Sequence, residues 1–201
     1  MGSIKLPHAS GNSMSIAAPA TNPSGDLELK LPATIGAAGE VVQNSTTAGT
    51  LEMGSPFRPA FSAYTSASYD IAASTAVKGL FQTEFFDTDN AYNTSTSTFT
   101  VPANMGGAYQ VNAQVSVDDI NDGTYIYCAI YLDGAEMSQV RSSYGYSPAA
   151  DKIMTASMSN VLKLTAGQTV NVYVYHNSTG TQSSENPLNW FSMFRLGGVA
   201  T

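Results

Sequence analysis

Apolar and polar residues alternate along much of the chain after residue 60. The clearest run is 109–117, where Tyr109 and every second residue after it are apolar and the residues between them are polar. A period of two is the pattern of a strand with one buried and one solvated face. The same pattern predicts strands at residues 60–63, 80–86, 98–101, 108–117, 125–132, 157–164, 169–175 and 190–196.

Turn-forming residues separate these runs, and no window has the period of a helix. Examples are the asparagine- or glycine-containing stretches at residues 121–123, 132–134 and 166–168. Such residues adopt the backbone conformations that tight hairpin turns require. Many short strands with turns between them predict an all-β fold, an antiparallel jelly-roll sandwich.

The first 56 residues differ in composition from the rest. All twenty aromatic residues lie between Phe57 and Phe194, which predicts a boundary between residues 1–56 and 57–201. The first part keeps short alternating pieces at residues 4–6, 14–16, 27–31 and 50–53. Small aliphatic residues alone bury too little area to offset the entropy of folding. Two interpretations stay open: strands that need a partner's face, or a disordered linker.

Composition excludes several classes of function. Only 11% of residues are charged, 44 are Ser or Thr, and the net charge is -7 with eight scattered basic residues. Nucleic-acid binding needs clustered Lys and Arg, so it is not expected. No apolar stretch is long enough for a membrane span, and the first twenty residues lack the pattern of a secretory signal. A single cysteine, Cys128 in an apolar run, predicts a buried, inert thiol and no intrachain disulfide.

No catalytic constellation is apparent, so we expect a protein that is not an enzyme, with no catalytic residue and no cofactor. His8 and His176 have no Cys or His neighbour at the spacing of metal ligands, and we expect His176 at the surface. No nucleophile elbow accompanies the many serines.

One acidic stretch has the residue types that calcium prefers. Asp118, Asp119 and Asp122 lie in a predicted loop that ends in Gly123. Oxygen-rich loops of this kind bind Ca²⁺, but the glutamate that closes such a loop is missing here. A calcium site and an ordinary solvated hairpin loop both remain open, and the ordinary loop is the simpler interpretation.

A second stretch is rich in tyrosine. Tyr144 and Tyr146 flank a glycine within the predicted loop 141–152, among small polar residues. This composition is typical of adaptable recognition surfaces. The two tyrosines are therefore candidate receptor or glycan contacts, with a plain connecting loop as the alternative.

The order of the strands in the second part resembles the C1q-like jelly roll of the tumour-necrosis-factor type. The matching pieces are PAFSAY at 59–64, STFTVP at 97–102, GGAYQVNAQVSV at 106–117, AIYLDG at 129–134, NVLKLTAGQTVNVYV at 160–174 and NWFSMFRL at 189–196. The chain departs from the family pattern at Gln168, where an acidic residue is common, and at Met193, where glycine is common. The resemblance implies a homotrimer. It suggests aromatic interface residues, for which the intrachain core is the alternative: Tyr109, Tyr127, Tyr173 and Phe191.

The first 56 residues are similar to stem segments of bacteriophage tail fibres and other virion proteins, in which strands of three chains interleave. The resemblance implies a trimeric protein on the outer surface of a phage particle, made in the host cytoplasm. Residues 1–56 would then form a β-stem that contacts other virion proteins. A short tail fibre that binds a host receptor is favoured. A capsid decoration protein is the alternative, and a bacterial or host C1q-type lectin is a third interpretation.

Overall fold

The computed structural model of the 201-residue chain describes residues 3–7, 13–17, 28–45, 49–54, 58–121, 123–145 and 152–198. Residues 3–7, 13–17, 44, 138–145 and 152 are described by their backbone alone. The chain divides into two compact units, Met1–Pro56 and Phe57–Thr201, and each is described by itself. The described residues contain no helix, and therefore none that is long and apolar enough to cross a membrane.

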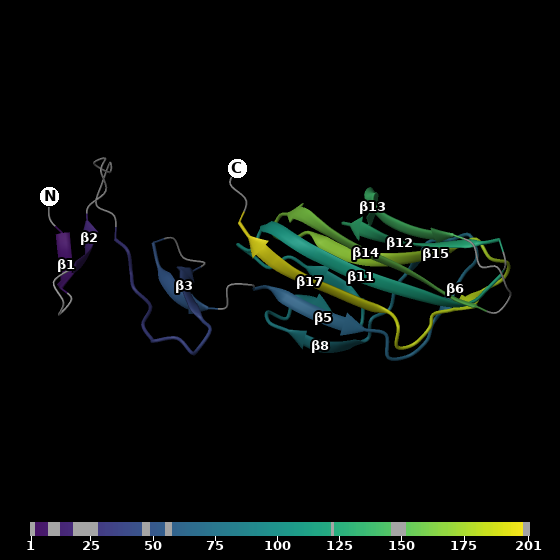
Figure 1. The fold of residues 1–201 in the computed structure, drawn as a ribbon, viewed down its shortest axis with the longest axis horizontal. Helices are drawn as coiled ribbons and strands as arrows, with labels where there is room; N and C mark the ends of the chain where they lie inside the picture. The colour runs from purple at the N-terminus through teal and green to yellow at the C-terminus, as the bar shows by residue number, and fades with distance from the viewer. Residues whose placement is uncertain are drawn as a thin grey trace. The chain divides into compact units, whose positions relative to one another are not determined.

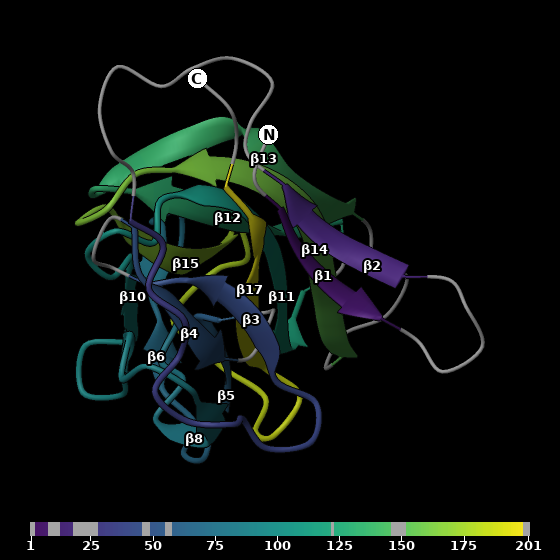
Figure 2. The ribbon, with the colours of Figure 1, turned by 90° about the vertical axis from the view of Figure 1, so that its left-hand side faces the viewer.

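The second unit is a sandwich of two antiparallel sheets (Figures 1 and 2). The all-β jelly-roll prediction is confirmed. The first sheet, which we call the β12 sheet, has the order β13 (Ala135–Gly145), β12 (Tyr125–Leu132), β15 (Thr169–His176), β10 (Thr98–Thr100) and β9 (Tyr92–Asn93), and β7 (Val77–Lys78) also pairs with β15. The second, the β11 sheet, has the order β14 (Lys152–Leu164), β11 (Gly107–Ile120), β17 (Trp190–Gly197), β5 (Ala60–Tyr64) and β8 (Thr83–Asp87). A small third pair consists of β6 (Asp70–Ile71) and β16 (Gln182–Ser183).

The alternation in β11 determines which of its faces is buried. Tyr109, Val111, Ala113, Val115 and Val117 are fully buried, whereas the residues between them up to Gln114 are partly exposed. Successive side chains of a strand point to opposite faces, so the apolar set packs inward against the other sheet. The core that results lies between the two sheets.

Aromatic rings fill one end of this core. Phe61 from β5 contacts three rings: it stacks on Tyr92 and Phe99 at centroid distances of 4.4 and 5.2 Å and meets Phe191 edge-on at 4.9 Å. Stacked and edge-to-face pairs contribute about 0.5–1.5 kcal/mol each beyond the area they bury. Because these rings come from both sheets, they hold the two layers in one relative position.

Several strand boundaries differ from the sequence-based expectation. β13 was not predicted, β14 begins at Lys152 instead of residue 157, and β11 continues to Ile120. β13 is an edge strand whose main chain pairs with β12 from Leu132↔Ala135 to Tyr125↔Gly145. Backbone pairing needs no hydrophobic alternation, so the polar sequence of β13 carries little strand signal.

The described residues of the first unit form two antiparallel strand pairs, β1 (Ser3–Pro7) with β2 (Ser13–Ala17) and β3 (Val41–Asn44) with β4 (Leu51–Gly54). The run predicted at residues 27–31 contributes a single parallel bridge, Lys30↔Thr50. β3 was missed because two adjacent valines break the period of two.

Candidate functional site

Five tyrosines lie on the outer surface of the β12 sheet, and we call this surface the tyrosine face. In β12 and β15 they alternate with residues that point into the core, such as Cys128 and Val174. The antiparallel register places Tyr127 opposite Tyr175 and Ala129 opposite Tyr173. The members of the tyrosine face are Tyr125, Tyr127, Tyr131, Tyr173 and Tyr175.

The rings of the tyrosine face form two stacks. Tyr175 stacks on Tyr127 at 4.6 Å, with ring planes 11° apart, and on Tyr125 at 5.7 Å. Tyr131 and Tyr173 stack at 3.7 Å with planes 22° apart. Rings that lie against one another have few alternative orientations, so this surface is preorganised for contact with a partner.

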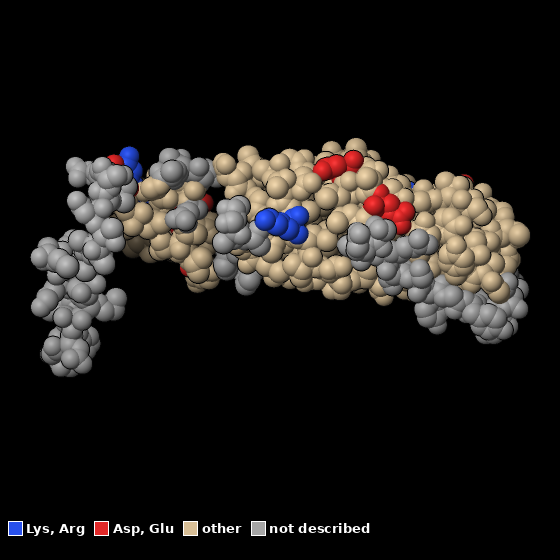
Figure 3. Space-filling model, turned by 90° about the horizontal axis from the view of Figure 1, so that it is seen from above, with Lys and Arg blue, Asp and Glu red and all other residues tan. Residues whose placement is uncertain are grey.

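Charged residues border the tyrosine face: Glu136 and Lys78 lie opposite Tyr131 and Tyr173, and Arg141 of β13 pairs with Ala129. Desolvation and, next, the carboxylate of Glu136 raise the pKa of Tyr131, whose hydroxyl lies 3.4 Å from Glu136 Oε2. Lys78 lies opposite Tyr173 in the register, but its amine donates to Thr96 O at 2.9 Å and to Thr98 Oγ1 at 3.1 Å. Desolvation lowers the pKa of Lys78. The sandwich surface seen in Figure 3 carries only scattered charged groups.

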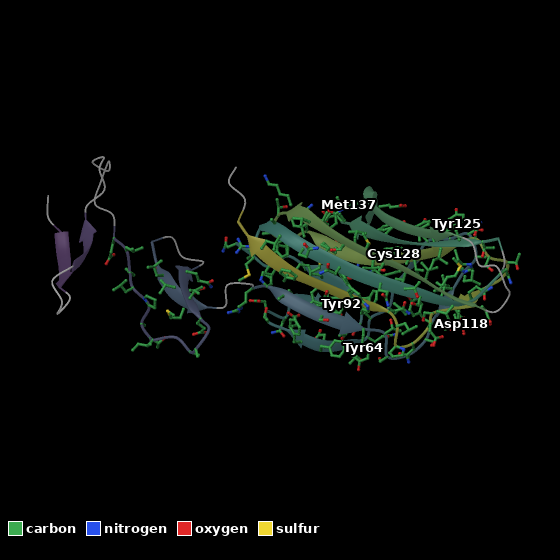
Figure 4. The ribbon with its side chains drawn as sticks, viewed as in Figure 1. Tyr64, Tyr92, Asp118, Tyr125, Cys128 and Met137 are labelled. Atoms are coloured by element: carbon green, nitrogen blue, oxygen red, sulfur yellow. The ribbon has the colours of Figure 1, made fainter. Side chains whose placement is uncertain are left out.

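A second aromatic cluster lies at the edge of the β11 sheet, and we call it the aromatic edge. It consists of Tyr64 from β5 and Phe85 and Phe86 from the edge strand β8. The side chain of Phe85 is 70% exposed and that of Phe86 is 51% exposed, while Tyr64 lies against Phe85 at 4.7 Å. Figure 4 labels Tyr64 on this side of the sandwich.

A register shift explains why two consecutive phenylalanines are both exposed. Between Ser62 and Ala63 the pairing of β5 with β8 slips, so that Ser62 faces Phe86 and Ala63 faces Glu84. A bulge of this kind leaves one residue of the longer strand without a partner and changes the direction of its side chain. Phe85 is that extra residue, and it leaves the inward-outward alternation of β8.

Polar side chains of β11 and β14 lie on the outer face of the β11 sheet, and they form hydrogen bonds with one another. Gln110 Nε2 donates to Ser159 Oγ at 2.8 Å and to Asn112 Oδ1 at 3.2 Å, and Ser159 Oγ donates to Asn112 Oδ1 at 2.9 Å. Gln114 Nε2 donates to Leu188 O at 2.8 Å. Polar groups that are already paired cost less to bury. This face can therefore be covered by another protein surface with a small desolvation cost.

The fold and these surfaces can be compared with known proteins. A sequence model of the C1q domain matches residues 60–196, more than half of the chain. The chain belongs to the C1q domain family. Such domains are generally non-enzymatic structural or signalling modules; they typically form homotrimers and bind receptors.

Solved structures of the C1q and tumour-necrosis-factor type share the fold at low sequence identity. The globular domain of zebrafish complement 1qA is 16% identical with a TM-score of 0.51, and the match covers 71% of this chain and all of that one. The Eiger TNF of S. frugiperda is 16% identical with a TM-score of 0.53, over 73% of this chain and 96% of that one. Murine APRIL at pH 5.0 is 12% identical with a TM-score of 0.51, over 69% and 98%. A search of curated protein sequences found no significant match.

Two of the four aromatic residues predicted at a trimer interface lie elsewhere in the C1q domain. Tyr109 and Phe191 have no exposed surface and pack between the sheets, which is the intrachain-core alternative for both. Their burial follows from the alternation of β11 and β17, because Tyr109 and Phe191 lie at positions whose side chains point into the core. Tyr127, only 7% exposed, and Tyr173 belong to the tyrosine face, and their role at an interface stays a prediction.

The candidate calcium ligands do not form a loop as predicted. Asp118 and Asp119 lie within β11, near a register shift between Val117 and Ile120, and Asp122 lies outside the described residues. Asp118, labelled in Figure 4, accepts a hydrogen bond through its Oδ1 from the backbone N–H of Asp119 at 2.9 Å. Within the described part of the chain, no three His, Cys, Asp or Glu side chains come together in a group that could hold a metal ion.

The candidate receptor contacts are only partly described. Tyr144 lies in strand β13, opposite Ile126 of β12, and not in a loop as the sequence suggested. The backbone ladder with β12 continues through this residue as far as Gly145. Tyr146 lies outside the described residues.

Two side chains that could take part in chemistry, His176 and Cys128, are buried. His176 is fully buried, contrary to the expectation of a surface position, because it shares the inward phase of Val172 and Val174 in β15. Its Nε2 lies 2.8 Å from the carbonyl oxygen of Ile71. Burial raises the pKa of the Cys128 thiol to about 12. Neither group is accessible to a substrate in this conformation.

Sequence reasoning named Tyr127 and Tyr173 of the tyrosine face but not the face as a whole, and it missed the aromatic edge. The signal for the first was the odd-numbered tyrosines of two alternating runs, which must share a face once the runs pair. The signal for the second was the doublet Phe85-Phe86, because in a regular strand two neighbours cannot both point inward.

Proposed function

We propose that the protein is a non-enzymatic homotrimer on the outer surface of a bacteriophage particle, with the C1q domain as a displayed head. In this proposal residues 1–56 join the head to other virion proteins, and the head contacts a host surface. The observation that carries the proposal is the aromatic edge: Phe85 and Phe86 are large, apolar and exposed on an edge strand. An uncovered apolar edge of this kind promotes association and is usually covered by a partner.

The two aromatic surfaces are assigned different roles on physical grounds. Phenylalanine has no polar atom, so Phe85 and Phe86 gain most when another copy of the head excludes water from them. The tyrosines of the tyrosine face can keep their hydroxyl groups in water while their rings stay stacked. The aromatic edge is therefore the self-association surface, and the tyrosine face is the surface left for a receptor. Three heads that bind together multiply a weak individual affinity.

Measuring the oligomeric state of the full chain tests the proposed homotrimer. Sedimentation velocity of the wild-type protein is expected to give a trimer at micromolar concentration. The double variant Phe85→Ser/Phe86→Ser is expected to sediment as a monomer, with an unchanged far-UV circular dichroism spectrum. The matched control, Tyr131→Ser/Tyr173→Ser, changes two rings of the other sheet and should leave the trimer intact. A monomeric wild-type protein would overturn the proposal.

The position on the particle is tested separately. Quantitative mass spectrometry of purified virions gives the copy number of the chain relative to virion proteins of known stoichiometry. A small multiple of three per particle supports a tail fibre, whereas hundreds of copies support a capsid decoration protein. Absence of the chain from purified particles would contradict a virion role.

Receptor contact is tested on host cells. Purified trimers are expected to bind the host surface and to compete with virions for it. The Tyr131→Ser/Tyr173→Ser variant should lose at least tenfold in apparent affinity while it remains trimeric. Unchanged binding by this variant would exclude the tyrosine face as the contact surface.

A further inference from the structure

The N-terminal unit contains a small mixed sheet in which most of the aliphatic residues lie on one face. The hairpin register pairs Val42 with Met53, and directly opposed residues of an antiparallel pair share a face. The parallel bridge Lys30↔Thr50 adds the segment around residue 30 beside β4, with Lys30 N donating to Gly49 O at 2.9 Å and Leu51 N donating to Lys30 O at 2.8 Å. The register then places aliphatic side chains together on one face, which we call the N-terminal apolar face: Leu29, Leu31, Val42, Leu51 and Met53.

The N-terminal apolar face is open to solvent within a single copy of this unit. Leu29 is 63% exposed, Leu31 is 75% exposed and Val42 is 56% exposed, while Leu51 and Met53 are half-buried. Among the residues of this unit whose side chains are described, only Gly54 is buried. A sheet with one apolar face and no second layer is not stable alone in water.

The opposite face carries the charges, together with Val41, which is 42% exposed. Lys30 and Glu28 form an exposed ion pair at 3.7 Å, and Gln43 Nε2 donates to Glu52 Oε1 at 3.3 Å. None of the five residues of the N-terminal apolar face is charged. The carboxylate beside it is that of Glu40: Gly36 lies against both Met53 and Glu40 Oε2, and this oxygen accepts a hydrogen bond from Ala37 N at 2.7 Å. Two copies of the face can therefore approach without burying an unpaired charge from the face itself.

We infer that the N-terminal apolar face is covered by the same face of other copies of this chain. This inference rests on the homotrimeric head proposed above. The described N-terminal sheet ends at Gly54 and the described C1q domain begins at Arg58, so a trimeric head keeps three copies of the sheet within a short tether of one another. A short tether corresponds to a millimolar effective concentration, which favours contact with a copy over contact with any dilute partner. Closed symmetry then lets each copy bury the same residues.

Hydrogen exchange of the full-length trimer tests the inference. Amides of residues 28–54 should exchange at least tenfold faster in Leu29→Ser/Leu31→Ser/Val42→Ser than in the wild-type chain. All three side chains are exposed in one copy, so their loss should affect residues 28–54 only if other copies cover them. The control Glu28→Ser/Glu52→Ser changes the polar face and should leave exchange unchanged.

Cross-linking gives a second measurement with a matched control. Under mild oxidation Leu31→Cys should form disulfide-linked dimers between copies, whereas Lys30→Cys, on the opposite face, should form at least tenfold fewer. The native Cys128 is fully buried and does not compete.

The outcomes separate this inference from the proposed function. A trimer in which residues 28–54 exchange within seconds, or in which the variants and controls behave alike, would overturn the inference and leave the head assembly intact. Protection that appears only when another virion protein is added would also overturn it, because the occupant would then be that protein. A monomeric wild-type chain would instead contradict the proposed function itself.

Discussion

Phe61 in the β11 sheet stacks on Tyr92 in the β12 sheet, with ring centroids 4.4 Å apart and ring planes 9° from parallel. The hydroxyl group of Tyr92 also donates to the carbonyl oxygen of Phe81 at 2.9 Å. Burial raises the pKa of that hydroxyl, so it keeps its proton and remains a donor. The pair joins the two layers through packing, and the hydrogen bond holds Tyr92 to the segment between β7 and β8.

Phe61→Ala is therefore expected to lower the free energy of unfolding of the head by about 3–5 kcal/mol, the cost of a large cavity in a close-packed core. Urea denaturation followed by tyrosine and tryptophan fluorescence measures this change. Thr181→Ala, at an exposed position, is the control and should stay within about 0.5 kcal/mol of wild type. A loss of less than about 1 kcal/mol for Phe61→Ala would mean that the ring cluster does not hold the sheets together.

Asn189 connects two buried segments through its side chain. Its Oδ1 accepts a hydrogen bond from the backbone N–H of Ser116, and its Nδ2 donates to Glu185 O at 2.9 Å. Asn189→Ala leaves the buried Ser116 N–H without an acceptor, which costs about 1–3 kcal/mol in unfolding free energy. Asn186→Ala is the matched control, because water can replace its exposed bond to Ser66 O. Equal losses from the two variants would contradict the assigned role.

The thiol of Cys128 should be unreactive in the folded protein. Burial disfavours the thiolate and raises the pKa to about 12, and the thiolate is the form that reacts. A thiol reagent at about pH 8 is expected to label less than about 5% of native Cys128 and all of it after denaturation. Thr181→Cys, exposed on the same domain, serves as the positive control. Rapid labelling of native Cys128 would show that the sandwich opens.

Asp133 should contribute stability that depends on pH. Its carboxylate accepts from Thr169 N at 2.8 Å and from Gln168 Nε2 at 2.9 Å, and these bonds, the Thr169 bond first, lower its pKa below the ordinary 3.8. A lowered folded-state pKa means that this contribution is complete above the ordinary value and is lost as the pH falls through the lower one. Asp133→Ala should therefore have a lower thermal midpoint than wild type at about pH 6, and the difference should shrink at about pH 2. A difference that does not change with pH would show that the bonds do not depend on the charge.

Local pattern was sufficient to predict most of the second unit. The alternation around Tyr109 predicted both the strand and its buried face, and β12 was placed at its observed boundaries, Tyr125–Leu132. These features depend only on the period of side-chain direction along one strand, which the sequence displays directly. β13 was missed because an edge strand can be held by its backbone alone.

The position of a side chain across strands required the tertiary structure. His176 was expected at the surface because it ends a strand, but its phase in β15 and the carbonyl group of Ile71 place it in the core. The doublet Phe85-Phe86 lay in a predicted strand, but only the slipped register with β5 showed that both rings are exposed. Register depends on which strands pair, and no single strand encodes it.

The chain's own pattern thus determined that this protein is built from strands, where most of them run and which part of it lacks aromatic residues. Only the tertiary structure decided that five tyrosines from β12 and β15 lie together, and that the aliphatic residues near Leu31 and Val42 share one uncovered face. The physical reason is that alternation assigns a side chain to one of two faces, whereas pairing between distant segments decides which faces become neighbours and which remain in water.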